Sequence, residues 1–180
     1  MKYFLDTEFI EDGKTIDLIS IGIVTEDGRE YYAESLEAEF SKASEWVRQN
    51  VLPNLWSRQV NKSAYNAWVR DGGAGGLMSR KEIAFSARNF CDPKKFGEPQ
   101  FWAYYAAYDW VAFCQLFGTL MDLPKGFPKY CRDINQLCDE RGNPALPKKQ
   151  NKHNALADAQ WNKSAWEYLN SLKQIKQKRI

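Results

Sequence analysis

Two acids separated by one residue, Asp6 and Glu8, follow the apolar run Tyr3-Phe4-Leu5 near the start of the chain. If a strand continues through them, their spacing sends both carboxylates to the same face. Neighbouring carboxylates repel each other unless a cation neutralises them, and Mg²⁺ prefers oxygen ligands of this kind. If the strand ends at Leu5, both acids are ordinary solvated charges. The short motif leaves both interpretations open.

A third acid, Asp109, stands where the apolar, β-rich run 101–107 changes into a helical pattern. A carboxylate at the start of a helix is stabilised by capping and by the helix dipole, so it needs no further role. The carboxyl ends of strands are also where α/β proteins bind their ligands. The position of Asp109 therefore suits a structural role and a chemical role equally well.

His153 is the only histidine, and it precedes Asp158 by five residues. It follows a polar, basic, proline-containing segment, which disfavours a buried core histidine. Five residues on a helix subtend about 140° beyond a full turn, so the two side chains converge only if His153 precedes the helix and Asp158 lies in its second turn. An imidazole, whose ordinary pKa is about 6.5, suits a general base beside carboxylates that hold a metal.

The elements that position these residues begin with three predicted strands, which are separated by the hairpin signals Asp12-Gly13 and Asp27-Gly28. Helices and further strands then alternate, and this order predicts an α/β fold: a mixed sheet, with an antiparallel three-strand meander plus parallel strands, flanked by α-helices. The predicted strands are 3–5, 16–25, 30–33, 101–107 and 129–132, and the predicted helices are 41–50, 79–90, 109–117, 133–141 and 155–173. Trp46 is expected on the buried face of the first helix, and loops are expected over the Gly-rich segment 72–76 and over 144–152.

The composition fits one compact domain over residues 1–180, with a basic C-terminal tail over 171–180. The net charge of +2 does not indicate a polycationic nucleic-acid-binding protein. The four cysteines show neither a CxxC pair nor zinc-ligand spacing, so we expect unpaired thiols in a reducing cytoplasm. No run approaches the roughly 18 apolar residues that a membrane span needs, and we expect no membrane association.

Taken together, Asp6-x-Glu8, Asp109 after a strand and His153-x-x-x-x-Asp158 resemble, in type and chain order, the DEDDh family of 3′–5′ exonucleases. The resemblance spans residues 3 to about 170, and the opening YFLDTEFIEDG is most similar to the small bacterial and phage polyadenylate-type 3′-exoribonucleases. The chain departs from many relatives at 104–108, where Tyr-Tyr-Ala-Ala-Tyr stands in place of Asn-x-x-Phe before the third acid.

The resemblance implies a ribonuclease H-like fold and hydrolysis of single-stranded RNA from its 3′ end to 5′-mononucleotides. It also implies a cytoplasmic protein, bacterial or phage-encoded, that forms a homodimer. Two Mg²⁺ or Mn²⁺ ions about 3.5–4 Å apart are expected, with His153 as the general base. The metal ligands implied by the resemblance are Asp6, which bridges both ions, Glu8 and Asp158 at the ion that holds the water, and Asp109 at the second ion.

Four residues beside these motifs are predicted to contact substrate: Thr7, Phe9, Trp110 and Lys152. The two aromatic residues either stack on bases or pack in the core. Lys152 belongs to a basic cluster with Lys148 and Lys149, and this cluster either binds phosphates or is a solvated loop.

Other functions remain open at this stage. An exonuclease acting on DNA would use the same scaffold, because contacts to the 2′-hydroxyl separate the two substrates. A catalytically inactive nucleic-acid-binding module is less favoured, since all four acids and the histidine are present. A ribonuclease H-type endonuclease does not require His153, and a single histidine disfavours a zinc hydrolase.

Overall fold

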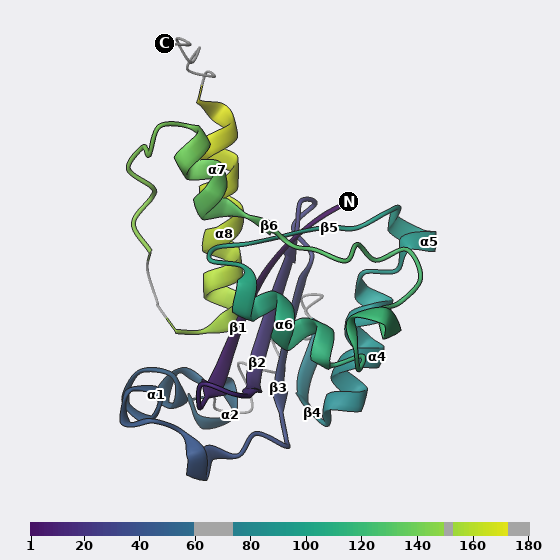
Figure 1. Ribbon diagram of the computed structural model, residues 1–180, viewed down its shortest axis with the longest axis vertical. Coiled ribbons are helices and arrows are strands. Elements are labelled where there is room, and N and C mark those ends of the chain that lie inside the picture. Colours follow the sequence, from purple (N-terminus) through teal and green to yellow (C-terminus); the bar gives the residue numbers. More distant parts are fainter. Residues whose placement is uncertain (60–73, 150–152, 173–180) are drawn as a thin grey trace.

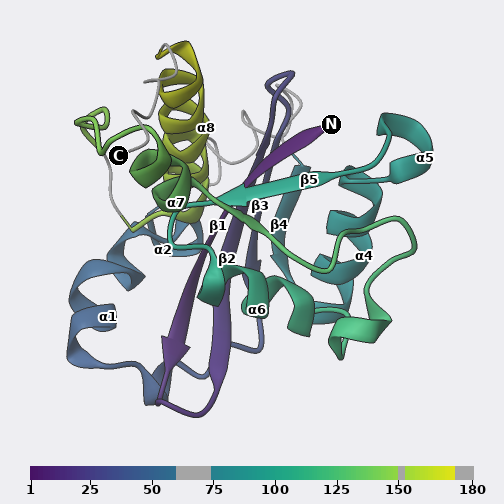
Figure 2. The same cartoon turned by 45° about the horizontal axis from the view of Figure 1, so that its top comes forward.

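The computed structural model describes residues 1–59, 74–149 and 153–172, which form a six-stranded mixed sheet covered by helices (Figures 1 and 2). The strand order across the sheet is β4-β3-β2-β1-β5-β6. The predicted α/β class is confirmed, and the arrangement is consistent with a ribonuclease H-like fold. The strands are β1 (Lys2–Glu11), β2 (Ile16–Thr25), β3 (Glu30–Ser35), β4 (Ala74–Met78), β5 (Gln100–Ala103) and β6 (Arg132–Asp133).

The first three strands form the predicted antiparallel meander, but β1 is longer than the sequence suggested. It pairs with β2 as far as Glu11, opposite Ile16, so both early acids lie within the strand. The interpretation that the strand ends at Leu5 and leaves them solvated is therefore wrong. Continuous pairing with the β-branched strand β2 carries the extended conformation through the two polar positions.

The parallel part of the sheet is short on one side of β1. β5 pairs with β1 only over Lys2–Phe4, and β6 pairs with β5. β5 ends at Ala103, earlier than the predicted 107. The second half of β1 therefore extends beyond its parallel neighbour, and side chains from other elements can reach its backbone there.

The Gly-rich segment is a correction to the predicted loop. Residues 74–78 form β4, which pairs in parallel with β3, while 72–73 lie outside the described residues. Gly75 has a φ of +126°, and a Cβ there would come within 1.8 Å of the carbonyl oxygen of Tyr32. The glycine is needed because the two backbones lie so close together, a use that composition does not distinguish from a flexible loop.

Each of the five predicted helices has a counterpart among the described residues, and two short α-helices, Trp56–Gln59 and Pro93–Phe96, were not predicted. A capping box at Ser79 starts the helix 80–90, and Asp133 caps the helix 134–140. The predicted helix 41–50 is split in two, and its Trp46 is 54% exposed rather than buried, because the α-helical part begins only after the Ser44 N-cap. The α-helices are α1 (Glu45–Asn50), α2 (Trp56–Gln59), α4 (Arg80–Phe90), α5 (Pro93–Phe96), α6 (Ala107–Gln115), α7 (Ile134–Glu140) and α8 (Ala155–Ser171), and the 3₁₀ turns are η1 (Phe40–Lys42), η2 (Leu52–Asn54) and η3 (Leu120–Asp122).

The two faces of β1 pack against different helices. Tyr3 and Leu5 belong to the core cluster that includes residues of α4 and α6, whereas Phe4 packs with α7 and α8. Figures 1 and 2 show α6 running in front of β1 and β2. Because side chains alternate along a strand, Asp6 and Glu8 share the α8 side with Phe4.

Gly22 allows the start of α8 to approach the sheet. It lies opposite Asp6 in the β1–β2 register. A Cβ on Gly22 would come within 2.2 Å of the carbonyl oxygen of Ala155, the first residue of α8. The first turn of α8 therefore rests on bare backbone beside the first acid.

The four cysteines are all free, as predicted, and Cys91, Cys114 and Cys138 are buried. Among the described residues, no helix has both the length and the apolar character required to cross a membrane. Most of the predicted basic tail lies outside the described residues, which end at Leu172.

Candidate active site

A cavity of about 310 Å³ brings the five predicted residues together. Three of the four acids among them are nearly inaccessible to solvent: Glu8 is 8% exposed, Asp109 7% and Asp158 2%. Charged groups are seldom buried without partners of opposite charge, so their convergence in one cavity requires a chemical explanation. The five residues are Asp6, Glu8, Asp109, His153 and Asp158.

Strand β1 supplies Asp6 and Glu8 from alternating positions, which places them on the same face as predicted. The pairing with β2 shifts by one residue between Glu8 and Phe9. Irregularities of this kind bend a strand and redirect its side chains, and they are common next to functional sites.

Asp109 reaches the site from the third position of α6 through Thr7. The backbone N–H and the hydroxyl of Thr7 each donate a hydrogen bond of 2.7 Å to Oδ1 of Asp109. This contact is possible because β5 has already ended, so a carboxylate takes the place that a parallel strand would otherwise occupy beside β1. Thr7, predicted as a substrate contact, lines the cavity with its hydroxyl engaged in positioning the third acid.

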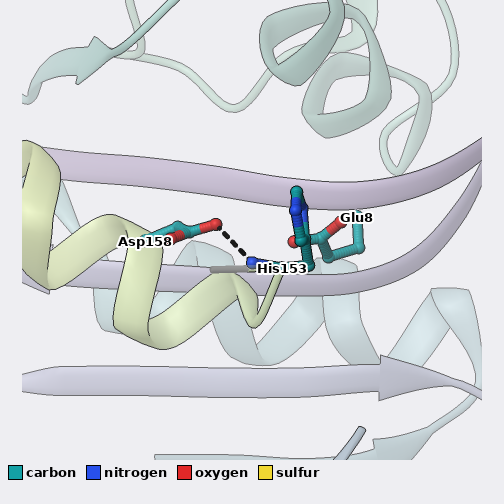
Figure 3. A group of neighbouring side chains, drawn as sticks. All are labelled: Glu8, His153 and Asp158. Carbon is teal, nitrogen blue, oxygen red and sulfur yellow. Dashed lines mark hydrogen bonds between the residues drawn. The ribbon is translucent and has the colours of Figure 1, made fainter. Parts of the chain in front are cut away.

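Asp158 lies in the first turn of α8, one turn earlier than predicted, and is joined to His153. The backbone N–H of His153 donates a 3.0 Å hydrogen bond to Oδ2 of Asp158, which is drawn in Figure 3. Glu8, His153 and Asp158 each offer a ligand atom, and these atoms lie within 4.8 Å of one another. The predicted convergence of a histidine before the helix with an acid inside it is thus observed.

The residues around His153 hold it in an uncommon conformation. Its φ is +65°, in the left-handed region that costs a non-glycine residue roughly 1–2 kcal/mol. The Trp46 ring meets the imidazole edge to face at 4.8 Å. Asn154 caps α8 through its bond to the Ala157 N–H and also donates to the carbonyl oxygen of Asn54 at 2.9 Å. Strained residues of this kind cluster at functional sites.

Burial and mutual repulsion make the charged forms of the acids unfavourable. Burial, followed by the charges of Asp109, Glu8 and Asp158, raises the pKa of Asp6 well above its ordinary value. Burial and the Asp158 charge raise the pKa of Glu8 to about 8. Burial raises the pKa of Asp109 to about 6 in spite of the Thr7 hydrogen bonds, and burial also raises the pKa of Asp158.

A divalent cation fits this donor set. Four carboxylates supply hard oxygen ligands, and a dication would neutralise the negative charges that, after burial, raise the pKa values of Asp6 and Glu8. The imidazole beside Glu8 and Asp158 adds a group able to exchange a proton near such an ion.

Lys149 is a cationic member of the site that the sequence identified only as part of a basic cluster. Its Nζ lies 3.0 Å from Oδ1 of Asp158. Its positive charge offsets part of the rise in the pKa of each of the four acids. Lys148 is exposed, and Lys152, the predicted substrate contact, lies outside the described residues. The basic run directly before the only histidine was the signal that pointed to this segment.

Aromatic side chains surround the acids. Phe9 stacks on Tyr108, with ring centroids 5.8 Å apart and planes inclined by 13°, and both line the cavity. Tyr104, Tyr105 and Trp46 line it as well, and Tyr105 is 63% exposed. Of these five residues, only Phe9 was predicted to contact substrate, although the three tyrosines fall in the segment 104–108 that departs from many relatives.

Trp110 is placed away from the cavity. It is 9% exposed, and its ring packs against Phe101 at 5.3 Å and Phe113 at 5.4 Å. Of the two interpretations that the sequence allowed, base stacking and core packing, its position favours core packing.

Comparison with known proteins gives one consistent result. The family model described as the 3′-5′ exoribonuclease Rv2179c-like domain matches residues 1–170. The chain is 43% identical over 160 residues to the 3′-5′ exoribonuclease Rv2179c of Mycobacterium tuberculosis strain H37Rv. The matched region covers 88% of this chain and 87% of the relative. It has the same identity and coverage with the 3′-5′ exoribonuclease MT2234.1 of strain CDC 1551. The chain therefore belongs to the Rv2179c-like 3′-5′ exoribonuclease family.

Proposed function

We propose that this protein is a metal-dependent 3′–5′ exoribonuclease of the DEDDh type, which releases 5′-mononucleotides from the 3′ end of single-stranded RNA. The observation that carries the proposal is the convergence of four acids and the only histidine in one cavity. Membership of the exoribonuclease family and the names of the two relatives support the choice of RNA.

The four acids Asp6, Glu8, Asp109 and Asp158 would hold two Mg²⁺ or Mn²⁺ ions. Glu8 and Asp158, which lie together with His153, would hold the ion on the side of the attacking water. Asp109, fixed by Thr7, would serve the other ion. When bound, such a pair of ions activates a water molecule and stabilises the leaving 3′-oxygen.

His153 is proposed to accept the proton from the water. Its backbone N–H is fixed on Asp158 and its ring rests against Trp46, so the imidazole is held beside the carboxylates before substrate arrives. A neutral imidazole is a suitable acceptor near neutral pH, and positioned general bases contribute about 10²–10⁴-fold to a rate.

The aromatic residues are proposed to hold the bases at the 3′ end. Tyr105 and Tyr108 are 63% and 51% exposed, and the Phe9 ring stacks on that of Tyr108. Stacking on such rings requires bases that are not paired, which favours single-stranded RNA. The cavity volume of about 310 Å³ is at the lower end of the range of small-ligand sites and suits one terminal nucleotide.

The test uses purified protein with RNA and DNA oligonucleotides of the same sequence, each labelled at the 5′ end. With Mg²⁺ or Mn²⁺, we expect the RNA to shorten stepwise from its 3′ end with release of 5′-mononucleotides, and no reaction in EDTA. RNA blocked by a 3′-phosphate and the Asp6→Asn variant are the matched controls. Intact RNA, internal cuts or full activity in EDTA would overturn the proposal, and faster shortening of DNA would reassign the substrate.

A further inference from the structure

Both carboxylate oxygens of Asp158 already have partners. Oδ2 accepts the backbone N–H of His153 at 3.0 Å, and Oδ1 lies 3.0 Å from the ammonium of Lys149. A metal ion bound by Asp158 must share or displace one of them. The backbone N–H is fixed at the start of α8, whereas the ammonium is at the end of a flexible side chain, so it is the partner that can leave.

A second contact keeps Lys149 close to the site. Its Nζ lies 5.3 Å from the ring centroid of Trp161, three residues beyond Asp158 on the same side of α8. The indole N–H of Trp161 donates a 2.9 Å hydrogen bond to the carbonyl oxygen of Pro147. The segment before Lys149 is therefore tied to α8, and its ammonium can leave Asp158 without leaving the cavity.

We propose that the ammonium of Lys149 and a divalent cation compete for Asp158, and that the displaced ammonium then binds a phosphate group of the RNA end. The inference rests on the proposed function for its second half and on the observed ion pair for its first. A dication among the four acids repels the ammonium, while a phosphodiester near the same ions attracts it. Metal binding would thus release the lysine that holds the substrate.

The first experiment measures Mn²⁺ binding in the absence of RNA, for the wild type, Lys149→Met and Lys148→Met. Methionine keeps the length of the side chain and its packing on Trp161, and the exposed neighbour Lys148 controls for a general loss of positive charge. We expect Lys149→Met to bind Mn²⁺ about tenfold more tightly and Lys148→Met to change by less than twofold. Equal effects of the two substitutions, or no effect, would overturn the competition.

Chemical labelling of lysines distinguishes displacement from a distant charge effect. We expect acylation of Lys149, followed by mass spectrometry, to become several-fold faster when Mn²⁺ is added, because the ammonium has left its ion pair. Lys148 serves as the internal reference. Unchanged or slower labelling of Lys149 on Mn²⁺ addition would contradict displacement even if the affinities agreed.

The third experiment measures binding of a 5′-labelled RNA to the His153→Ala protein, in which cleavage is suppressed. Adding Lys149→Met is expected to weaken RNA binding about tenfold with Mn²⁺ and less than twofold in EDTA. An equal loss in both conditions, or no loss, would overturn the phosphate contact. These readouts do not depend on hydrolysis. A wild-type protein that leaves RNA intact would contradict the proposed function, whereas an unaltered Mn²⁺ affinity in Lys149→Met would contradict this inference.

Discussion

Thr7 donates two hydrogen bonds to a single oxygen of Asp109, one from its backbone and one from its hydroxyl, each 2.7 Å long. The two residues are 102 positions apart in the chain, and the pair joins β1 to the start of α6. The residue between the first two acids thus fixes the third. An acid of α6, a helix whose Trp110, Ala112 and Phe113 pack in the core, is in this way directed into the cavity.

Replacing Thr7 with valine keeps the shape of the side chain and the backbone hydrogen bond but removes the hydroxyl bond to Asp109. We expect about a tenfold fall in kcat for RNA hydrolysis, since Asp109 loses one of two restraints. The free energy of unfolding should fall by only about 1 kcal/mol, as for other single hydrogen bonds. Steady-state kinetics and thermal unfolding check both values, and Thr7→Ser should restore the rate. Failure of serine to rescue would argue that Thr7 acts by packing alone.

His153→Ala tests the general base separately from the fold. We expect the rate of RNA hydrolysis to fall at least 10²-fold, because the water loses its proton acceptor. The backbone N–H that bonds Asp158 is retained, so Mn²⁺ affinity and thermal stability should change little. Asp158→Ala, in contrast, should abolish both hydrolysis and tight Mn²⁺ binding. A His153→Ala enzyme with full activity would remove the histidine from the mechanism.

The types and chain order of the acids were sufficient to predict that they converge with His153, as the cavity lining shows. Asp6 and Glu8 could be assigned to one face from strand periodicity alone. The partners of the other two acids, Asp109 and Asp158, could not be predicted from periodicity. The contact of Thr7 with Asp109 depends on where β5 ends, and the contact of Lys149 with Asp158 depends on the path of a loop without periodicity.

Two errors have the same origin. Gly75 was interpreted as a loop residue, although it permits close pairing of β4 with β3. Trp46 was assigned to the core because it is apolar, although it is 54% exposed and contacts His153. A glycine can serve a flexible loop or a close approach of two strands, and a tryptophan can pack in the core or line a cavity. In both cases only the tertiary neighbours decide which of the two occurs.

Gly22→Ala is expected to displace the start of α8 and with it Asp158. The added Cβ would lie 2.2 Å from the Ala155 carbonyl oxygen, so the helix must move away from β2. We expect a loss of about 1–3 kcal/mol in the free energy of unfolding, as for other overpacked sites, together with at least a tenfold fall in hydrolysis. Gly13→Ala is the control: its φ of +79° predicts strain, but nothing lies within 4 Å of the new Cβ. Equal loss of hydrolysis in both variants would show that the contact with α8 is unimportant.

Removal of metal should make stability depend on pH in a defined direction. Burial raises the pKa of Glu8 from 4.5 to about 8, so the folded protein retains a proton that the unfolded chain has already lost between these values. Because the unfolded state binds fewer protons, stability in EDTA should fall as pH rises from about 4.5 to 8, with Asp109 contributing up to its pKa of about 6. Mg²⁺ replaces those protons, so it should raise Tm more at pH 8 than at pH 5. Thermal unfolding of the wild type and Glu8→Gln checks this: the variant should show a weaker pH dependence in EDTA. An identical dependence in both proteins would exclude Glu8 as its source.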